Sequence, residues 1–203
     1  MKINLLAPDI YEIENFLTFE ENQKFLEYCK NLDEPAWWVK DEKEEVPYHL
    51  DGKMCFWNDE ETPELFDNLN KKIETLFSSY HSLVKAQLFR NLKTQSIREH
   101  RDNITGVHNL KKHQNRYGIV VYFNDEYTGG EIFYPYYGIY HKPKSGSLIM
   151  HGGNVLHGTT EVSNDVIRYF STSFVRENDL NPVTLNKSIF GDIEQSDGYK
   201  YSI

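Results

Sequence analysis

The stretch GIVVYFNDEYTGGEIFYP, residues 118–135, decides the fold class of this chain. Its two apolar runs are rich in Val, Ile, Tyr and Phe, which pack well on a pleated surface, and turn residues separate the runs. Similar short runs, interrupted by Asn, Asp, Gly and Ser, extend from about Val84 to Val175. Many short strands at this spacing are typical of a β-sandwich or jelly roll. We therefore predict a β core over residues 84–176.

Two helices are expected before this core. Thr18 and Glu21 form a capping-box pattern that begins a helix through about Asn31. A second helix begins at Thr62, with Pro63 at its first helical position. The apolar face of the first helix comprises Phe19, Phe25, Leu26 and Cys29. In the second, apolar residues recur every three or four positions: Leu65, Phe66, Leu69, Ile73, Leu76, Phe77 and Tyr80. Helices that precede a β core and brace one of its sheets predict an α+β fold.

The length of 203 residues suits a single domain, spanning residues 1–203. Within it we expect N-terminal strand and helix support over residues 1–83, the jelly-roll core over 84–176 and an irregular tail over 177–203. Residues 41–61 are polar and acidic, so they form either a loop or a pair of short strands. Whether this segment is a lid over a site is left open, as is the oligomeric state.

Charge and cysteine content exclude several classes of protein. A net charge of −9 opposes non-specific binding along a nucleic acid backbone, although a local basic patch can override that average. Cys29 and Cys55 lie far apart and match no zinc spacing, so a disulfide framework is not expected. No signal peptide or membrane span is recognisable, because apolar runs are short. We therefore expect a cytoplasmic protein without membrane contact.

Four polar residues stand out within the predicted β core. His100 and Asp102 are two positions apart in an extended stretch, so both side chains point to one face. A second histidine, His157, lies in another strand-like run, and Arg168 follows it by eleven residues. Two imidazoles and one carboxylate leave three positions open on a metal, the arrangement of non-haem iron(II) oxygenases. An organic acid can chelate through two of these positions, and Arg168 is the candidate partner for its distal carboxylate.

The motifs around these residues resemble a known family. They are EHRDN, GIVVYFNDEYTGGEIFYP, KPKSGSLIMHGG, VLHGTTEV and IRYFSTSFV, in that order. From about Leu88 to Val175 the sequence is similar to the double-stranded β-helix core, a jelly roll, of the iron(II)- and 2-oxoglutarate-dependent dioxygenases. The likeness is greatest to the prolyl 4-hydroxylase-like branch found in phages and bacteria. It covers under half of the chain closely.

The resemblance implies a set of site residues. His100, Asp102 and His157 are similar to the iron ligands, and Arg168 to the residue that anchors 2-oxoglutarate. Tyr122 resembles a second anchor for this co-substrate. Thr172 shares the face of Arg168 in an extended strand, so its hydroxyl is a further candidate contact near the same carboxylate.

The resemblance also implies the reaction. Iron(II), 2-oxoglutarate and dioxygen hydroxylate an unactivated C–H bond and release succinate and CO2, with ascorbate as an additional reductant. Retention of Asp102 favours hydroxylation over halogenation, since halogenating relatives replace this carboxylate. The expected substrate is a peptidyl or free amino acid, proline by likeness alone. The alternatives are oxidation of a nucleobase or nucleotide, and a catalytically silent, cupin-like metal-binding module.

Other polar and aromatic residues have two interpretations each. His151 competes with His157 as a ligand, but it lies seventeen residues before Arg168, too far for a single turn between strands. Arg98 is either a substrate contact or a surface arginine. The basic segment 108–113 is either a solvated loop or an anion-binding patch. A tyrosine cluster is an aromatic wall for a substrate or ordinary packing: Tyr134, Tyr136, Tyr137 and Tyr140. The resembling family has variable substrate loops where three tryptophans lie in this chain, and these have the same two interpretations: Trp37, Trp38 and Trp57.

Overall fold

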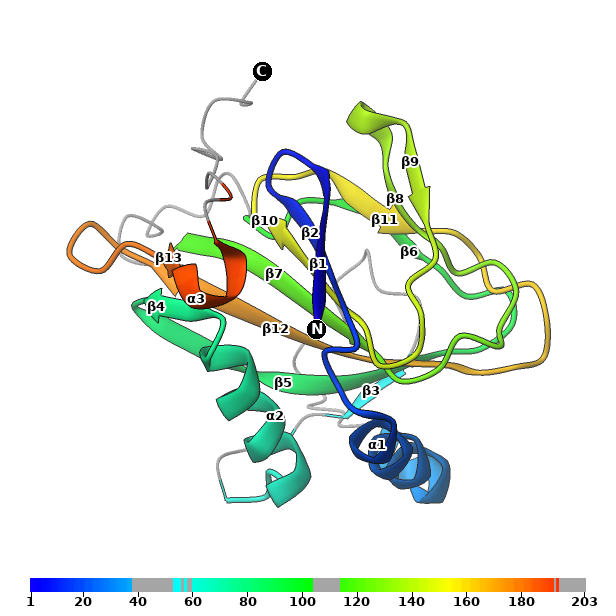
Figure 1. The fold of residues 1–203 in the computed structure, drawn as a ribbon. Helices are drawn as coiled ribbons and strands as arrows, with labels where there is room; N and C mark the ends of the chain where they lie inside the picture. The colour runs from blue at the N-terminus through cyan, green and yellow to red at the C-terminus, as the bar shows by residue number, and fades with distance from the viewer. Residues whose placement is uncertain (38–52, 56, 58–59, 104–113, 192, 194–203) are drawn as a thin grey trace, which may run out of the picture.

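A computed structural model describes residues 1–37, 53–55, 57, 60–103, 114–191 and 193 of the chain (Figure 1). Most of segment 41–61, all of the basic segment 108–113 and Trp38 lie outside the described residues, as does the end of the tail. The predictions about a lid and about an anion-binding patch therefore stay predictions. No helix in the described ranges has the length and hydropathy that crossing a membrane requires.

Antiparallel strands dominate the structure. The larger sheet has seven strands in the order β1-β2-β10-β7-β12-β5-β3, and the smaller has four in the order β6-β11-β8-β9. The strands of the larger sheet are β1 (Lys2–Ala7), β2 (Ile10–Glu14), β3 (Lys53–Cys55), β5 (Ser82–Asn91), β7 (Gln114–Tyr122), β10 (Leu148–Gly152) and β12 (Arg168–Glu177). Those of the smaller sheet are β6 (Ile97–His100), β8 (Ile132–Tyr134), β9 (Ile139–His141) and β11 (His157–Thr159). Every pair among them is antiparallel.

Helices cover one face of the larger sheet, and the smaller sheet lies over its other face (Figure 1). The helices are α1 (Phe19–Asn31), α2 (Glu64–Glu74) and α3 (Lys187–Phe190), with short 3-10 helices η1 (Glu34–Trp37) and η2 (Pro135–Tyr137). Strand β7 shows how the two layers are built. Ile119 and Val121 point to the helices, whereas Val120 and Tyr122 point between the sheets. Burial on both faces explains why residues 119–123 form an unbroken apolar run.

The first predicted helix is confirmed, with one correction. Thr18 and Glu21 form the capping box, each side chain bonding the other residue's backbone N–H. Phe25, Leu26 and Cys29 are buried, but Phe19 is 75 % exposed, so its place in the apolar face is wrong. Phe19 is the first helical residue and its side chain points away from the core.

The second helix is shorter than predicted. Pro63 is the residue before the helix and not its first helical residue, and α2 ends at Glu74. Beyond it, Phe77 begins strand β4 (Phe77–Ser79), which pairs with β13 (Thr184–Leu185). The helical spacing of Leu76, Phe77 and Tyr80 was misleading, because all three residues pack against the same core from a strand and its flanks.

The C-terminal segment is more regular than predicted, and the N-terminal segment contributes strands as well as helices. Strands β1 and β2 extend the larger sheet through β10. The prediction of an irregular tail is wrong for its described part. Strand β13 pairs with β4, and α3 buries Phe190 against Tyr11 of β2. These contacts join residues more than a hundred positions apart, which local sequence patterns do not reveal.

Candidate metal centre

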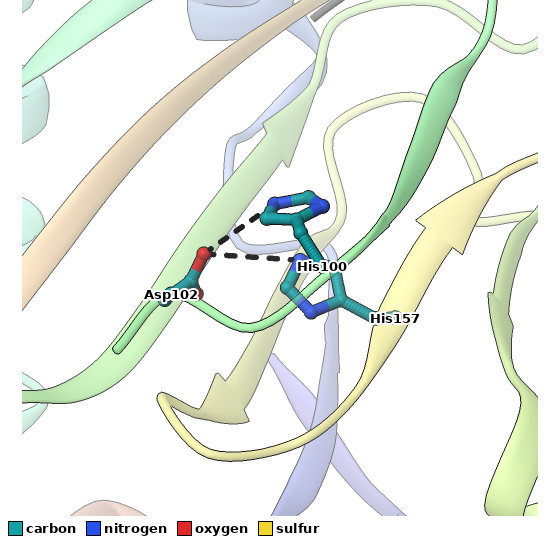
Figure 2. A group of neighbouring side chains, drawn as sticks. All are labelled: His100, Asp102 and His157. Atoms are coloured by element: carbon teal, nitrogen blue, oxygen red, sulfur yellow. Dashed lines mark ion pairs between the residues drawn. The ribbon is translucent and has the colours of Figure 1, made fainter. Parts of the chain in front are cut away.

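Two neighbouring strands of the smaller sheet carry the predicted imidazole ligands. His100 is the last residue of β6 and His157 the first residue of β11. The two residues pair directly across the strands, and their ring centroids lie 4.3 Å apart. Asp102 lies beyond the end of β6, so a bend after His100, and not the pleat of one strand, directs its side chain. Figure 2 shows its carboxylate facing both imidazoles.

The three side chains surround one point. Asp102 Oδ1 lies 3.6 Å from His100 Nε2 and 3.9 Å from His157 Nε2. One ligand atom from each residue lies within 4.8 Å of the other two. Bonds from nitrogen and oxygen ligands to a divalent transition metal measure roughly 2.0–2.2 Å. Small side-chain rotations therefore bring all three residues onto one ion.

Backbone carbonyls orient the two imidazoles. His100 Nδ1 lies 2.8 Å from the carbonyl oxygen of Arg98, and His157 Nδ1 lies 3.0 Å from that of Val155. Each Nδ1–H donates to its carbonyl, which leaves the lone pair of each Nε2 facing Asp102. A fixed tautomer and ring orientation of this kind is what a metal-binding histidine needs.

Burial and neighbouring charges set the protonation states. Burial lowers the pKa of His157 to about 3, and the charges of His151 and His100 add to this effect while Asp102 opposes it. Burial alone would raise the pKa of Asp102. The positive charge of nearby imidazoles, first that of His157, and a hydrogen bond from His151 outweigh burial and hold this pKa at about 2. At neutral pH, His157 is neutral and Asp102 is ionised, the forms that bind a metal ion.

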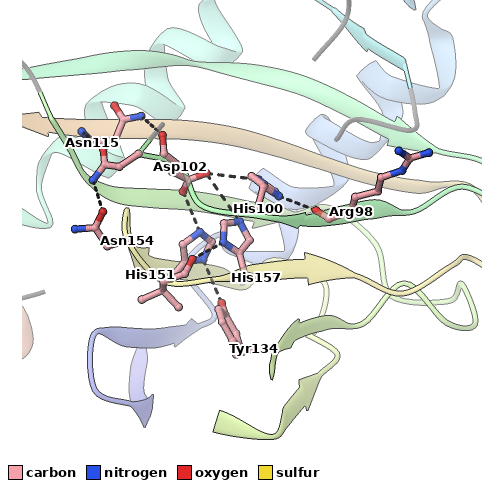
Figure 3. Close-up of polar contacts among 10 residues, drawn as sticks. Arg98, His100, Asp102, Asn115, Tyr134, His151, Asn154 and His157 are labelled. Carbon is pink, nitrogen blue, oxygen red and sulfur yellow. Dashed lines mark hydrogen bonds and ion pairs between the residues drawn. The ribbon is translucent and has the colours of Figure 1, made fainter. Parts of the chain in front are cut away.

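A third histidine adjoins the group (Figure 3). His151, in β10, is 1 % exposed, and its ring centroid lies 3.9 Å from that of His157. Its Nε2 lies 3.2 Å from Asp102 Oδ2, whereas the pairs with the other two imidazoles are through Oδ1. Its Nδ1 lies 3.1 Å from the hydroxyl of Tyr134. His151 is therefore a hydrogen-bond partner of Asp102 in the structure.

A network of amides holds the bend that carries Asp102. Asn115 Nδ2 donates to the backbone oxygen of Asp102, and the Asn115 N–H donates to Asn103 Oδ1. The Asn103 side chain in turn contacts Asn154, and Arg101 donates to the carbonyl oxygen of Asn154. This network ties the bend to β7 and to the turn after β10.

A buried arginine lies in the same space between the sheets. Arg168 is 1 % exposed, and its Nη1 donates to Asn91 Oδ1 at 2.7 Å. Its Nη2 lies 3.5 Å from the Tyr122 hydroxyl, and its guanidinium lies against the ring of Phe170. Arg168 Nε has no hydrogen-bond partner, and no carboxylate of the described residues pairs with this guanidinium. An unneutralised buried cation of this kind is suited to an anionic ligand.

One cavity of about 310 Å³ connects the histidine group with the arginine. This volume falls at the lower end of the range for small-molecule sites, roughly 300–1,000 Å³. The walls are mostly apolar, and the same lining holds the histidine group, Arg168 and further polar side chains: His100, Asp102, His151, His157, Arg168, Tyr122, Lys85, Gln87, Thr159 and Thr172.

The remaining predicted residues have different positions. Thr172 lines the same cavity as Arg168, as strand parity predicts, but Phe170 lies between them along β12, and its contact with a carboxylate stays a prediction. Arg98 is exposed, and Figure 3 shows its side chain pointing away from the histidines. In the tyrosine cluster, Tyr134 is buried, whereas Tyr136 and Tyr140 are 70 % and 69 % exposed.

Three contacts of the site were not predicted from the sequence. They are the Asn91 contact to Arg168, the Tyr134 contact to His151 and the His151 contact to Asp102. The first of them follows from strand register, since Asn91 of β5 pairs directly with Arg168 of β12. Trp37 and Trp57 both pack in the core, so the packing interpretation applies to them.

No family model matches the sequence, and no curated protein matches it significantly. Solved structures do match. The 2-oxoglutarate complex of a viral collagen prolyl hydroxylase from Paramecium bursaria Chlorella virus-1 is 18 % identical, with a TM-score of 0.64 over 84 % of this chain and 97 % of the viral chain. A Trichoplax adhaerens prolyl hydroxylase, bound to a hypoxia-inducible factor peptide, is 17 % identical, with a TM-score of 0.65 over 84 % of each chain.

A third match has a different ligand. HygX from Streptomyces hygroscopicus, with nickel, 2-oxoglutarate and hygromycin B bound, is 12 % identical, with a TM-score of 0.59 over 85 % of this chain and 84 % of HygX. The viral enzyme and HygX are complexes with 2-oxoglutarate, and the Trichoplax adhaerens enzyme is a complex with a peptide, but identities this low carry the fold and not the substrate. The chain therefore has the fold of 2-oxoglutarate-binding prolyl hydroxylases and of HygX, as its sequence motifs predict.

Proposed function

We propose that this chain is an iron(II)- and 2-oxoglutarate-dependent hydroxylase, and that its two sheets form the double-stranded β-helix core of that enzyme class. One observation carries the proposal: the His100–Asp102–His157 group, whose side chains are at most 14 % exposed, and a buried, unneutralised Arg168 line the same cavity. The donor set of two imidazoles and a carboxylate suits iron(II) and leaves three positions open.

The side chains have separate roles in this proposal. His100, Asp102 and His157 hold the metal, and carbonyl contacts to both Nδ1 atoms keep the imidazoles in the binding tautomer. Arg168 pairs with the distal carboxylate of 2-oxoglutarate, assisted by Tyr122. When bound, iron(II) supplies the activation of dioxygen that couples decarboxylation of 2-oxoglutarate to hydroxylation.

The walls of the cavity also serve the reaction. They are mainly apolar, with Phe89, Phe170 and Phe174 among them. Such walls exclude water from the space between metal and substrate, which protects reactive species from side reactions. The C–H bond that is oxidised must enter through this apolar space, so an unactivated aliphatic group is the expected target.

The proposed substrate is a peptidyl or free amino acid, with proline as the first choice. The fold neighbour from Trichoplax adhaerens binds a peptide, and the motifs of this chain are most similar to prolyl 4-hydroxylases. Mass spectrometry of proline-containing peptides and of free proline, after incubation with the enzyme, tests this choice through the gain of one oxygen atom.

Formation of succinate tests the proposed chemistry directly. The metal-free protein is reloaded anaerobically with iron(II) and then given 2-oxoglutarate and air. We expect succinate formation that depends on iron and is abolished in His157→Ala. The matched control is His141→Ala, since His141 pairs with Glu12 and does not line the cavity. Full iron loading without any succinate, with and without candidate substrates, would favour a catalytically silent metal-binding module.

A further inference from the structure

We propose that Tyr134 and His151 form a hydrogen-bonded chain that holds Asp102 as a monodentate metal ligand. This inference rests on the proposed function and assigns roles to two residues that the motifs leave without one. Both are positioning residues, since they act through Asp102.

The chain is continuous and buried. The Tyr134 hydroxyl lies 3.1 Å from His151 Nδ1, and His151 Nε2 lies 3.2 Å from Asp102 Oδ2 (Figure 3). Tyr134 is 0 % exposed and His151 is 1 % exposed. Because solvent does not reach these groups, each hydrogen bond has no aqueous substitute, and losing one leaves a buried polar atom unpaired.

The supply of protons determines the direction of both hydrogen bonds. An ionised Asp102 only accepts, so His151 must donate through Nε2–H. A neutral imidazole then has an acceptor at Nδ1, and the Tyr134 O–H is its donor. One arrangement therefore satisfies all three groups: Tyr134 donates to His151, and His151 donates to Asp102.

The backbone of β7 closes this arrangement from one side. A Cβ atom on Gly118 would lie 2.1 Å from Asp102 Oδ2 and 2.8 Å from His151 Nε2. The backbone of Gly118 therefore lies in close contact with both partners of the hydrogen bond between Asp102 and His151. Rotation of the carboxylate would require Oδ2 to leave both His151 and this tight contact.

A fixed carboxylate controls how many positions the site leaves open. Asp102 Oδ1 faces His100 and His157, whereas Oδ2 is held by His151. With Oδ1 alone as a ligand, three positions of an octahedral ion remain free, enough for a chelating 2-oxo acid and dioxygen. If Oδ2 also coordinated, one of these positions would be lost.

Cobalt(II) is a suitable probe, because its visible absorption reports the ligands and coordination number of the site. The variants are His151→Leu, which removes the donor, His151→Gln, which keeps an N–H near the position of Nε2, and Tyr134→Phe, which removes only one oxygen atom. Removal of partners that orient a metal ligand weakens metal affinity by about 10–100-fold. We expect a loss of this size in His151→Leu, a smaller loss in Tyr134→Phe and substantial recovery in His151→Gln.

Two readouts separate positioning from a general structural role. The cobalt(II) spectrum with 2-oxoglutarate should change in His151→Leu, and thermal unfolding of each metal-free variant shows whether the fold persists. In the zinc(II)-loaded wild type, nitrogen-15 NMR should show His151 protonated at Nε2. Protonation at Nδ1 instead would overturn the proposal.

The other outcomes are also decisive. Equal cobalt(II) affinity and spectra in His151→Leu and wild type would overturn the chain, while wild-type succinate formation would leave the proposed function intact. Equal losses of cobalt(II) affinity in His151→Leu and His151→Gln would show that an N–H donor to Asp102 does not determine metal binding, which would overturn the proposal. If His151→Leu does not fold, Tyr134→Phe decides, since an unchanged affinity there contradicts the chain. A wild type that binds no cobalt(II) would instead reject the proposed function.

Discussion

Gly118 of β7 lies so close to Asp102 that a Cβ atom at position 118 would be 2.1 Å from the carboxylate oxygen Oδ2. Real non-bonded atoms do not approach this closely, so an alanine there must displace the carboxylate. The nearest flexible atoms belong to Asp102 and His151, the pair that we propose to be essential for metal binding.

We therefore predict that Gly118→Ala weakens metal binding by at least about 10-fold, the lower end of the effect of disturbing partners of a metal ligand. Isothermal titration of the metal-free variant with cobalt(II) measures it. Ser171→Ala is the matched control, because Ser171 is equally buried in β12, on the face away from the cavity. Unchanged affinity in Gly118→Ala would show that the carboxylate is not confined by β7.

A second prediction concerns the proposed contact between Arg168 and the distal carboxylate of 2-oxoglutarate. Asn91 Oδ1 accepts a hydrogen bond from Arg168 Nη1. Asn91→Asp keeps the shape of the side chain but adds a permanent carboxylate, which competes with the distal carboxylate of 2-oxoglutarate. Hydrogen bonds to charged groups contribute roughly 1.5–3 kcal/mol. We therefore expect the KM for 2-oxoglutarate to rise by about 10–100-fold, as measured by succinate formation at varied 2-oxoglutarate.

The control for this prediction is Asn164→Asp, which makes the same charge change in a turn outside the cavity. Its KM should equal that of the wild type. Arg168→Lys provides an independent check, since lysine keeps the charge but loses the planar, bidentate geometry. If both Asn91→Asp and Arg168→Lys leave the KM unchanged, the carboxylate of the co-substrate binds elsewhere.

A third prediction concerns a buried ion pair that joins the N-terminal hairpin to β7. Arg116 Nη1 and Nη2 donate to the two carboxylate oxygens of Asp9 at 2.8 and 3.1 Å, and both residues are buried. Arg116→Met leaves the Asp9 charge without its partner. Loss of one partner of a buried pair costs about 3–5 kcal/mol, so urea unfolding should show a decrease of this size.

The exposed pair of Lys93 and Asp165 is the control for that measurement. Lys93→Met should change the free energy of unfolding by less than about 1 kcal/mol, because water screens exposed charges. Adding Asp9→Asn to Arg116→Met should recover part of the loss, since it removes the unpaired charge and asparagine tolerates the positive φ of residue 9. A loss under 1 kcal/mol in Arg116→Met would contradict the role of this pair.

The fourth prediction concerns the two cysteines, Cys29 and Cys55, which are free and buried. Burial raises the pKa of Cys55 from 9.0 to about 11, and burial also raises the pKa of Cys29. A rise of two units reduces the thiolate fraction at pH 8 by about 100-fold, because each unit is a factor of ten. Both thiols should react slowly with Ellman's reagent in the folded protein, and Cys55 faster as the pH rises toward 11.

Unfolding in guanidinium chloride should restore rapid reaction of both thiols at pH 8. Cys29→Ser and Cys55→Ser assign each phase of the reaction. Rapid reaction of either thiol in the folded protein would mean that the surrounding core opens frequently.

Local signals determined the elements that the sequence predicted well. The start of α1 follows from Thr18 and Glu21, whose side chains bond within one helical turn. The two glycines at 129 and 130 have positive φ, which glycine adopts readily in a turn. By contrast, the end of α2 was misjudged because Phe77 pairs with Leu185, a residue far along the chain.

The candidate site likewise has residues that the sequence predicted and a contact that it did not. His100, Asp102, His157 and Arg168 were recognisable because they occur in motifs with known order and spacing. His151 was recognised as a rival ligand, but its place beside Asp102 was not. That place depends on the register of β10 and β7, which sets His151 opposite Gly118.

The sequence by itself therefore determined which residue types are available: strands from the Val, Ile, Tyr and Phe runs, and a histidine–aspartate–histidine set with a distant arginine. The tertiary structure alone decided their surroundings. Strand register joined Asn91 to Arg168, and the close approach of β7 joined His151 to Asp102. The physical reason is that hydrogen bonds between strands and contacts between sheets connect residues far apart in the chain, and no local pattern encodes those distances.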